Sequence, residues 1–190
     1  MNAVAKEVPM SDDSDTFTAP NGVTLQRSKL YVDGMGNVIA KLYTIDKQAD
    51  ADATDHLMAY YLDHNLISAE NVPGADDRFA PDEAESFCGA LSHAGFTDWE
   101  NPLPAQGVQL NDYTKFDPCV DTSAHPGITG GAFWTKQQTA WSKDEAGSSR
   151  SFWVVDLYYG YLGNSNANYR ARVRPVRRAV PAGQWLALGQ

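Results

Sequence analysis

The chain has 190 residues, 43% of them hydrophobic and 21% charged, which suits one domain with an appendage or two small domains around a sizeable core. Its formal net charge of −9 is unevenly divided, −12 over residues 1–100 and +3 over residues 101–190, and the acidic half argues against a nucleic-acid-binding protein. No apolar run approaches the roughly 20 residues of a membrane-spanning helix, so we expect no membrane insertion, and residues 1–10 have neither the basic start nor the apolar core of a secretory signal.

The first 80 residues are predicted to form an arm, a hairpin and a helix. Residues 1–20 are polar and acidic, and we expect a flexible arm. Residues 23–32 and 37–45 alternate apolar and polar side chains around Asp33-Gly34-Met35-Gly36, which predicts a β-hairpin. Residues 53–64 carry Leu57, Tyr60 and Tyr61 on one stripe of an amphipathic helix. Because a lone hairpin is marginally stable, we expect residues 21–80 to serve assembly or attachment.

The middle of the chain combines a well-marked helix with long loops. Pro81 in the first turn, the acidic residues after it and an apolar stripe through Phe87 and Cys88 predict a helix from Pro81 to about His93. Gly95 is the expected C-cap. Residues 98–135 are rich in Pro, Gly and Asn, and there we expect little regular structure.

Three short strands are predicted after these loops, near residues 132–135, 152–158 and 170–174. Five arginines crowd into residues 170–178, and such a cluster can bind phosphates. Alternation of arginines with Ala171 and Val173 instead favours a strand with one solvated arginine face and one buried apolar face. We expect residues 181–190 to form a C-terminal tail.

The candidate ligand-binding surface lies in residues 156–169, where tyrosines and asparagines replace the Val, Ile and Leu of a core strand. Tyrosine offers a large rigid contact area at low entropic cost, and small polar residues offer adaptable hydrogen bonds. The alternative is a strand with half-buried tyrosines, a turn at Gly163-Asn164-Ser165 and a second strand. The candidate binding residues are Tyr158, Tyr159, Tyr161, Asn164, Asn166, Asn168 and Tyr169.

No pattern in the chain favours catalysis, a metal or a cofactor. Neither Gly-x-Ser-x-Gly nor His-Glu-x-x-His occurs, so we expect no enzyme. The four histidines are scattered and expected to be structural. A loop with Asp112, Asp117 and Asp121 could bind calcium, but such aspartates more often cap turns. Cys88 and Cys119 are expected to be buried and reduced, with a disulfide as the alternative.

Five ordered segments carry a family resemblance. They are residues 86–99, residues 110–122, Ala132-Phe-Trp-Thr135, Phe152-Trp-Val-Val-Asp156 and Val173-Arg-Pro-Val-Arg177. Together they resemble the Legionella collagen-like protein C-terminal domain family over about residues 81–178. After Trp99 the chain reads Glu100-Asn-Pro-Leu-Pro104 where the family usually has Arg-Leu-Pro-Thr, so we expect this loop to pack differently.

The resemblance implies a fold and a kind of function. The family is similar to the C-type lectin fold, so we expect an α+β domain at residues 81–180 with two helices, a small twisted antiparallel sheet and long loops, and with Trp99, Trp134 and Trp153 in its core. Some members are variable proteins of diversity-generating retroelements, commonly carried by phages, in which mutagenesis of Asn codons diversifies a lectin-like face. By this analogy the seven candidate residues contact the ligand, while Trp153, Val155, Leu157 and Val173 hold the scaffold.

We therefore expect a non-enzymatic receptor-binding protein of a phage tail tip or tail fibre, located in the virion. Its expected partners are a host cell-surface protein or glycan, other tail proteins and further copies of the chain, with no cofactor. The alternatives are a bacterial surface adhesin and a structural virion component that binds no receptor. A neighbouring reverse-transcriptase gene with a template repeat would favour the first function.

Overall fold

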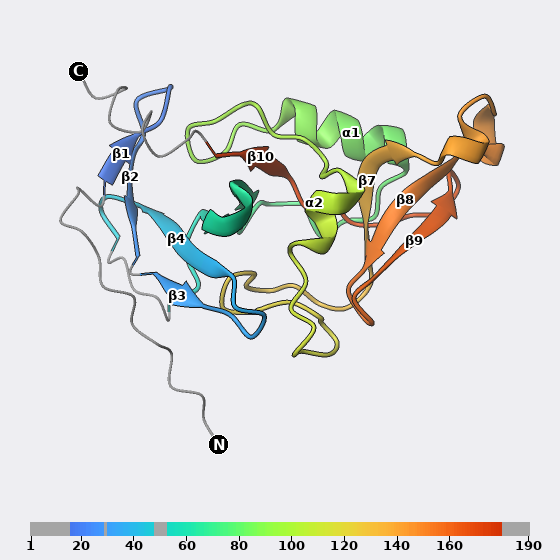
Figure 1. Cartoon of the computed structure of the whole chain (residues 1–190). Coiled ribbons are helices and arrows are strands. Elements are labelled where there is room, and N and C mark those ends of the chain that lie inside the picture. Colours follow the sequence, from blue (N-terminus) through green and yellow to red (C-terminus); the bar gives the residue numbers. More distant parts are fainter. Residues whose placement is uncertain (1–15, 29, 48–52, 180–190) are drawn as a thin grey trace.

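The computed structural model describes residues 16–28, 30–47 and 53–179, so most of the predicted arm and the predicted tail at 181–190 lie outside the described residues. The described chain is a mixed α+β structure with two α-helices and two antiparallel sheets (Figure 1). The helices are α1 (Pro81–Ala90) and α2 (Pro104–Val108), and short 3-10 turns are η1 (Leu62–His64), η2 (Ala140–Ser142) and η3 (Gly147–Ser149). Neither α-helix in the described ranges is long and apolar enough to cross a membrane.

Ten strands occur among the described residues. The larger sheet contains β1 (Thr16–Thr18), β2 (Thr24–Arg27), β3 (Tyr31–Val32), β4 (Val38–Thr44), β5 (Met58–Tyr61), β6 (Leu66–Ala69) and β10 (Val176–Arg178). The smaller sheet contains β7 (Ala132–Gln138), β8 (Ser151–Asp156) and β9 (Tyr161–Asn166), in that order.

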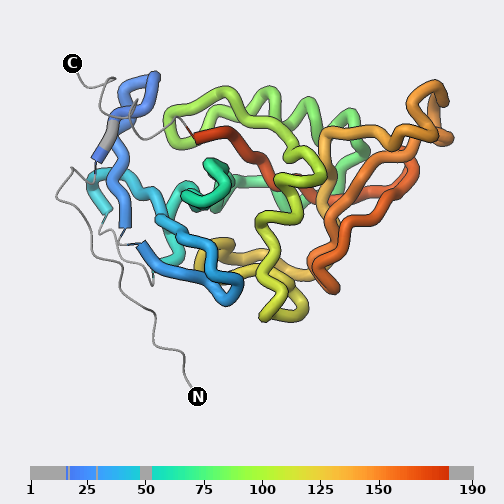
Figure 2. Tube along the Cα trace, viewed as in Figure 1, coloured from blue at the N-terminus to red at the C-terminus, as the bar shows by residue number. Residues whose placement is uncertain are grey.

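The larger sheet confirms the predicted hairpin and extends it. Both β2 and β3 pair with β4, and the Asp33 carboxylate closes the turn by accepting the N–H groups of Met35 and Asn37, each at 2.9 Å. The strand order is β1-β2-β4-β5-β6-β10, so the end of the chain pairs with β6. Figure 2 shows the red C-terminal segment returning toward the blue N-terminal strands.

The helix predicted at residues 53–64 is wrong. Met58–Tyr61 form β5, a central strand between β4 and β6, and Leu62–His64 form a 3-10 turn. Met58, Ala59 and Tyr61 are buried, so both faces of this strand pack against protein. A strand with two buried faces lacks strict alternation, and its apolar residues therefore fit a helical stripe equally well.

The helix at Pro81 is confirmed, but it ends at Ala90 and its C-cap is Leu91 rather than Gly95. Gly95 instead lies in the turn between His93 and Phe96, with a φ of +88°. A Cβ there would lie 2.5 Å from both Ala19 and Asn21. Glycine is therefore favoured by the backbone conformation and by this close approach.

The smaller sheet carries the candidate surface on its last strand. Gly163-Asn164-Ser165 lies inside β9, so the turn considered there is wrong, and the chain reverses at residues 157–160 instead. The strand predicted at residues 170–174 is also wrong. Ala171 makes an isolated bridge to Phe79, and Arg172 makes one to Phe133. The strand of this region, β10, begins later, at Val176.

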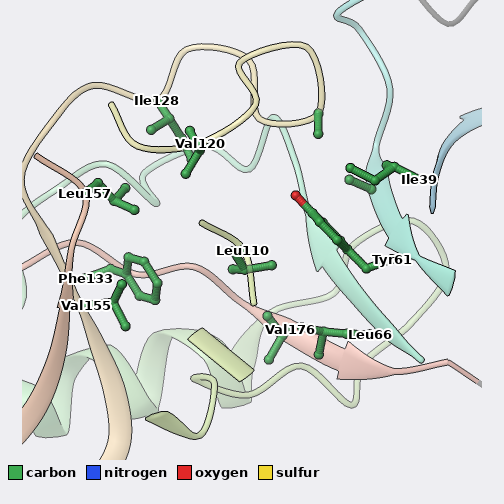
Figure 3. Packing of buried hydrophobic residues seen from close by; sticks show 12 residues of the cluster. Ile39, Tyr61, Leu66, Leu110, Val120, Ile128, Phe133, Val155, Leu157 and Val176 are labelled. Atoms are coloured by element: carbon green, nitrogen blue, oxygen red, sulfur yellow. The ribbon is translucent and has the colours of Figure 1, made fainter. Parts of the chain in front are cut away.

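The two sheets share a hydrophobic core. Its central cluster joins Ile39 and Tyr61 of the larger sheet to Phe133 and Val155 of the smaller one, and Figure 3 shows Val120 from a loop beside them. Of the three tryptophans expected in the core, Trp99 and Trp134 are buried, whereas Trp153 is half-buried. Loops dominate residues 98–131 as predicted, with α2 as the regular element among them.

Candidate ligand-binding surface

Four exposed aromatic side chains meet at the tip of the β8–β9 hairpin. We call Phe116, Tyr158, Tyr159 and Tyr161 the aromatic cluster. Ring centroids lie 4.9 Å apart for Phe116 and Tyr158, 4.4 Å for Tyr158 and Tyr159, and 6.3 Å for Tyr159 and Tyr161. Their exposed fractions are 65%, 37%, 65% and 53%, in chain order. Contiguous exposed apolar area of this kind marks an interaction site more often than an ordinary surface.

Polar contacts fix the backbone that carries these rings. The Asp156 carboxylate accepts the N–H groups of Tyr158 and Tyr159 at 2.9 and 3.0 Å. The buried Asn111 side chain donates to the Gly160 carbonyl at 2.9 Å. Gly160 has a φ of +74°, and a Cβ there would approach the Cys119 sulfur to 2.5 Å. The hairpin tip is thus held in one conformation, which lowers the entropic cost of binding.

A second, polar patch lies toward the other end of β9. A shallow hollow, which we call the asparagine hollow, is lined by Ser151, Asn164, Ser165, Asn166, Asn168 and Tyr169. The Asn166 side chain accepts the Asn168 N–H at 3.0 Å, and the Asn164 side chain accepts the Ser151 hydroxyl at 3.2 Å. Tyr161 and Asn164 are three residues apart, roughly 10 Å along a strand, and an odd separation places their side chains on opposite faces, so the two patches are distinct.

All seven predicted binding residues are exposed, but the structure divides them between these two patches. Of the residues assigned to the scaffold, Val155, Leu157 and Val173 are buried. Trp153 is half-buried and packs edge-on against the exposed Trp141 at 5.5 Å. Sequence reasoning missed Phe116, because the loop at residues 111–118 also contains Tyr113 and no local pattern separates the two aromatic residues.

Of the predicted solvated arginine face at Arg170, Arg172 and Arg174, only Arg170 is exposed, so the prediction is wrong for the other two, while Ala171 and Val173 are buried as expected. Arg174 and Arg177 are buried, and Arg172 is only 13% exposed. The structure pairs Arg172 and Arg174 with Asp76, Arg177 with Asp98, and Arg170 with Glu83. Since carboxylates neutralise four of the five arginines, the segment does not present a five-arginine phosphate site.

A buried hydrogen-bonded array joins Tyr61, His125 and Glu70. The Tyr61 hydroxyl lies 2.6 Å from His125 Nε2, and His125 Nδ1 lies 2.8 Å from Glu70 Oε1, which also accepts the Ser68 hydroxyl. Burial raises the pKa of Glu70, but His125 and Ser68 together hold it below its ordinary value. A hydroxyl, an imidazole and a carboxylate linked in this order also occur in catalytic relays. Here Tyr61 and His125 are at most 1% exposed, so the array anchors a loop to the larger sheet.

The cysteines and loop aspartates have structural contacts. Cys88 and Cys119 are buried free thiols, and burial raises the pKa of Cys88 to about 12, which keeps it protonated. Asp112 and Asp121 accept the N–H groups of Thr114 and Ser123, each at 2.9 Å, as turn caps do. Within the described ranges no three His, Cys, Asp or Glu side chains are grouped to hold a metal ion.

A comparison with protein families agrees with the resemblance found in the sequence. The model of the Lcl C-terminal domain matches residues 47–177, which is more than half of the chain. The match covers the five segments and reaches back through β5 and β6 of the larger sheet. No curated protein and no solved structure matches the chain.

Proposed function

We propose that this chain, which belongs to the Lcl C-terminal domain family, is a non-enzymatic binding protein whose ligand contacts the aromatic cluster, with the asparagine hollow as a second contact area. In this proposal it recognises a host cell-surface protein or glycan from a phage tail tip or tail fibre. The surface is presented by a C-type-lectin-like domain, whose helices support the smaller sheet and the long loops.

The exposed aromatic cluster is the observation that carries the proposal. Complete burial of an aromatic side chain removes roughly 150–250 Å² from water. The four rings are between 37% and 65% exposed, so each offers a part of that area to a partner. No charged residue occurs from Leu157 to Tyr169, so this part of the surface attracts a ligand through apolar contact, ring stacking and neutral hydrogen bonds. We therefore expect binding to depend only weakly on salt concentration.

The separation of exposed and buried residues supports a surface that tolerates variation. Tyr158, Tyr159 and Asn164 are exposed, whereas Val155 and Leu157 on the same hairpin are buried. Substitutions at the exposed positions leave the core packing intact, since those side chains contribute little to it. A diversified binding protein needs this property.

The test compares the wild-type chain with a variant in which Tyr158, Tyr159 and Tyr161 are all replaced by Ala. Both are applied to arrays of bacterial surface glycans and of immobilised bacterial surface proteins. We expect the wild type to bind a subset of the spots and the triple variant to lose that binding, because the cluster is reduced to Phe116. A Trp141→Ala variant is the matched control, since Trp141 is 64% exposed and outside the cluster.

Two outcomes would count against the proposal. A triple variant that binds the same spots as the wild type would place recognition elsewhere on the chain. A wild-type chain that binds no spot on either array would favour the structural virion component.

A further inference from the structure

Strand β9 is an open edge of the smaller sheet. The opposite edge, along β7, is covered, because the Trp134 N–H donates to the Arg172 carbonyl and the Arg172 N–H donates to the Ala132 carbonyl, each at 3.0 Å. β9 pairs with β8 alone and lies at the outside of the molecule (Figure 1). Edge strands are usually protected by Lys, Pro or a bulge. The sequence Tyr-Leu-Gly-Asn-Ser-Asn of β9 contains neither residue, and its register with β8 has no shift.

The ladder with β8 determines which backbone groups of β9 face outward. The Ala167 N–H donates to the Arg150 carbonyl at 2.9 Å, and hydrogen-bonded pairs recur at every second residue of an antiparallel ladder. Tyr161, Gly163 and Ser165 therefore bond to β8. The N–H and C=O groups of Leu162 and Asn164 point away from the sheet, and none of them bonds to another described residue.

We propose that β9 pairs in antiparallel fashion with β9 of a second copy of this chain, with the two-fold axis at Gly163. In this register Leu162 of each copy lies opposite Asn164 of the other. Every free N–H group of these residues then meets a free C=O group, and four hydrogen bonds form between the copies. The two ladders merge into one continuous six-stranded sheet.

The neighbouring symmetric registers match fewer free groups. With the axis on Leu162, Asn164 faces Gly160, whose carbonyl already accepts the Asn111 side chain. With the axis on Asn164, Leu162 faces Asn166, whose carbonyl already accepts the Tyr169 N–H. The pattern of free groups thus selects Gly163 as the centre.

The chemistry of this segment suits a second copy as the partner. Residues 157–169 carry no charge, so two copies meet here without like-charge repulsion, although the chain as a whole has a net charge of −9. Gly163 has no side chain on either face at the axis. A two-fold symmetric contact uses the same surface on both copies, so that surface must be complementary to itself. The register centred on Gly163 meets this condition.

The pairing has a consequence for the two surface patches, although it does not depend on the proposed function. Tyr161 of one copy lies opposite Ser165 of the second copy, and Ser165 lines the asparagine hollow. The aromatic cluster of each copy therefore adjoins the asparagine hollow of the other. Two patches that are separated within one chain become a composite surface in the dimer.

Light scattering on the full chain over a dilution series tests the pairing. We expect the wild-type mass to rise with concentration from 20.8 kDa toward twice that value. Asn164→Pro removes an outward N–H and no bond to β8, and proline is accepted at such positions of edge strands. This variant should stay monomeric and keep the wild-type circular dichroism spectrum and unfolding midpoint. Asn164→Ala keeps the N–H and should dimerise like the wild type.

Cysteine variants test the register. Residues in a hydrogen-bonded pair have Cα atoms about 5.5 Å apart, within disulfide range, whereas diagonal neighbours are about 7–8 Å apart. Oxidation of a mixture of Leu162→Cys and Asn164→Cys chains should give a covalent dimer, while each variant alone should not. The natural cysteines are buried and do not interfere.

Three results would overturn the proposal. They are a wild-type chain that is monomeric at every concentration, a dimer that survives Asn164→Pro, and crosslinking that is as efficient for the single variants as for their mixture.

Discussion

At the scale of single residues, Asp76 holds two arginines that are largely removed from solvent. Its Oδ1 lies 2.7 Å from Arg174 Nη2 and 3.5 Å from Arg172 Nε. We predict that Asp76→Ala lowers the free energy of unfolding by about 1–3 kcal/mol, because both guanidinium groups lose their carboxylate while they stay buried. Urea unfolding measures the change. Asp144→Ala, on the exposed surface, is the control, and equal stabilities of the two variants would contradict the role of Asp76.

Local patterns predict the direction of these side chains but not their partners. The alternation at residues 170–174 correctly places Ala171 and Val173 inside. The alternation does not show that Asp76 lies beside Arg174, because the two residues are 98 positions apart in the sequence. An arginine becomes buried only where the fold supplies a carboxylate, so solvent exposure could not be predicted here from sequence alone.

Because of the buried His56, we expect the free energy of unfolding to fall in acid. Burial lowers its pKa below the ordinary 6.5, although its Nε2 lies 2.8 Å from the Ala124 carbonyl. As pH falls through 6.5, the unfolded chain binds a proton that the folded chain does not, so stability is lost toward the lowered pKa. We predict a lower free energy of unfolding at about pH 5.5 than at about pH 7.5.

The matched variant for this prediction is His56→Gln, which cannot titrate. Urea unfolding at the two pH values should show a weaker pH dependence for the variant than for the wild type. Identical dependence in both chains would mean that His56 keeps its ordinary pKa when the chain is folded.

At the scale of elements, the three tryptophans of the smaller sheet and its loops differ in exposure, and Trp134 and Trp141 are the extremes. Trp134 on β7 is fully buried and donates its indole N–H to the Phe79 carbonyl at 2.8 Å, whereas Trp141 in η2 is 64% exposed. We predict that Trp134→Ala lowers the free energy of unfolding by about 3–5 kcal/mol. Trp141→Ala should lower it by less than about 1 kcal/mol. Thermal denaturation compares the two, and similar losses would contradict the assigned core.

Elements with strong local signals were predictable, and elements defined by pairing were not. The hairpin turn at Asp33 and the helix start at Pro81 depend on neighbouring residues, and both are confirmed. Residues 58–61 fit a helical stripe because both faces of β5 are buried in the core, Ala59 and Tyr61 on one face and Met58 on the other, while β4 and β6 pair with its edges. The strand β9 has no local signal because Gly163 and Asn164 favour turns in isolation, and only pairing with β8 makes them extended.

At the scale of the whole molecule, segments from both ends of the chain share one sheet. Val176 of β10 lies opposite Ser68 of β6, and the central core joins both sheets. No local pattern indicates such long-range pairing, so the sequence could not show it. The assembly role of residues 21–80 stays a prediction, and the β9 edge offers a separate contact between copies.

The candidate surface was largely predictable because composition alone marked residues 158–169. Its division into two patches follows from the alternation of side chains along β9, and Phe116 joins the aromatic cluster only through the fold. The central claim is therefore that the cluster is dispensable for folding and required for binding.

The most direct test of that claim is the dissociation constant of the triple Tyr158, Tyr159 and Tyr161→Ala variant for the strongest array ligand, measured beside the wild type. We predict at least about a tenfold weaker affinity, or ~1.4 kcal/mol, with the unfolding midpoint nearly unchanged. An unchanged dissociation constant in a folded triple variant would contradict the claim.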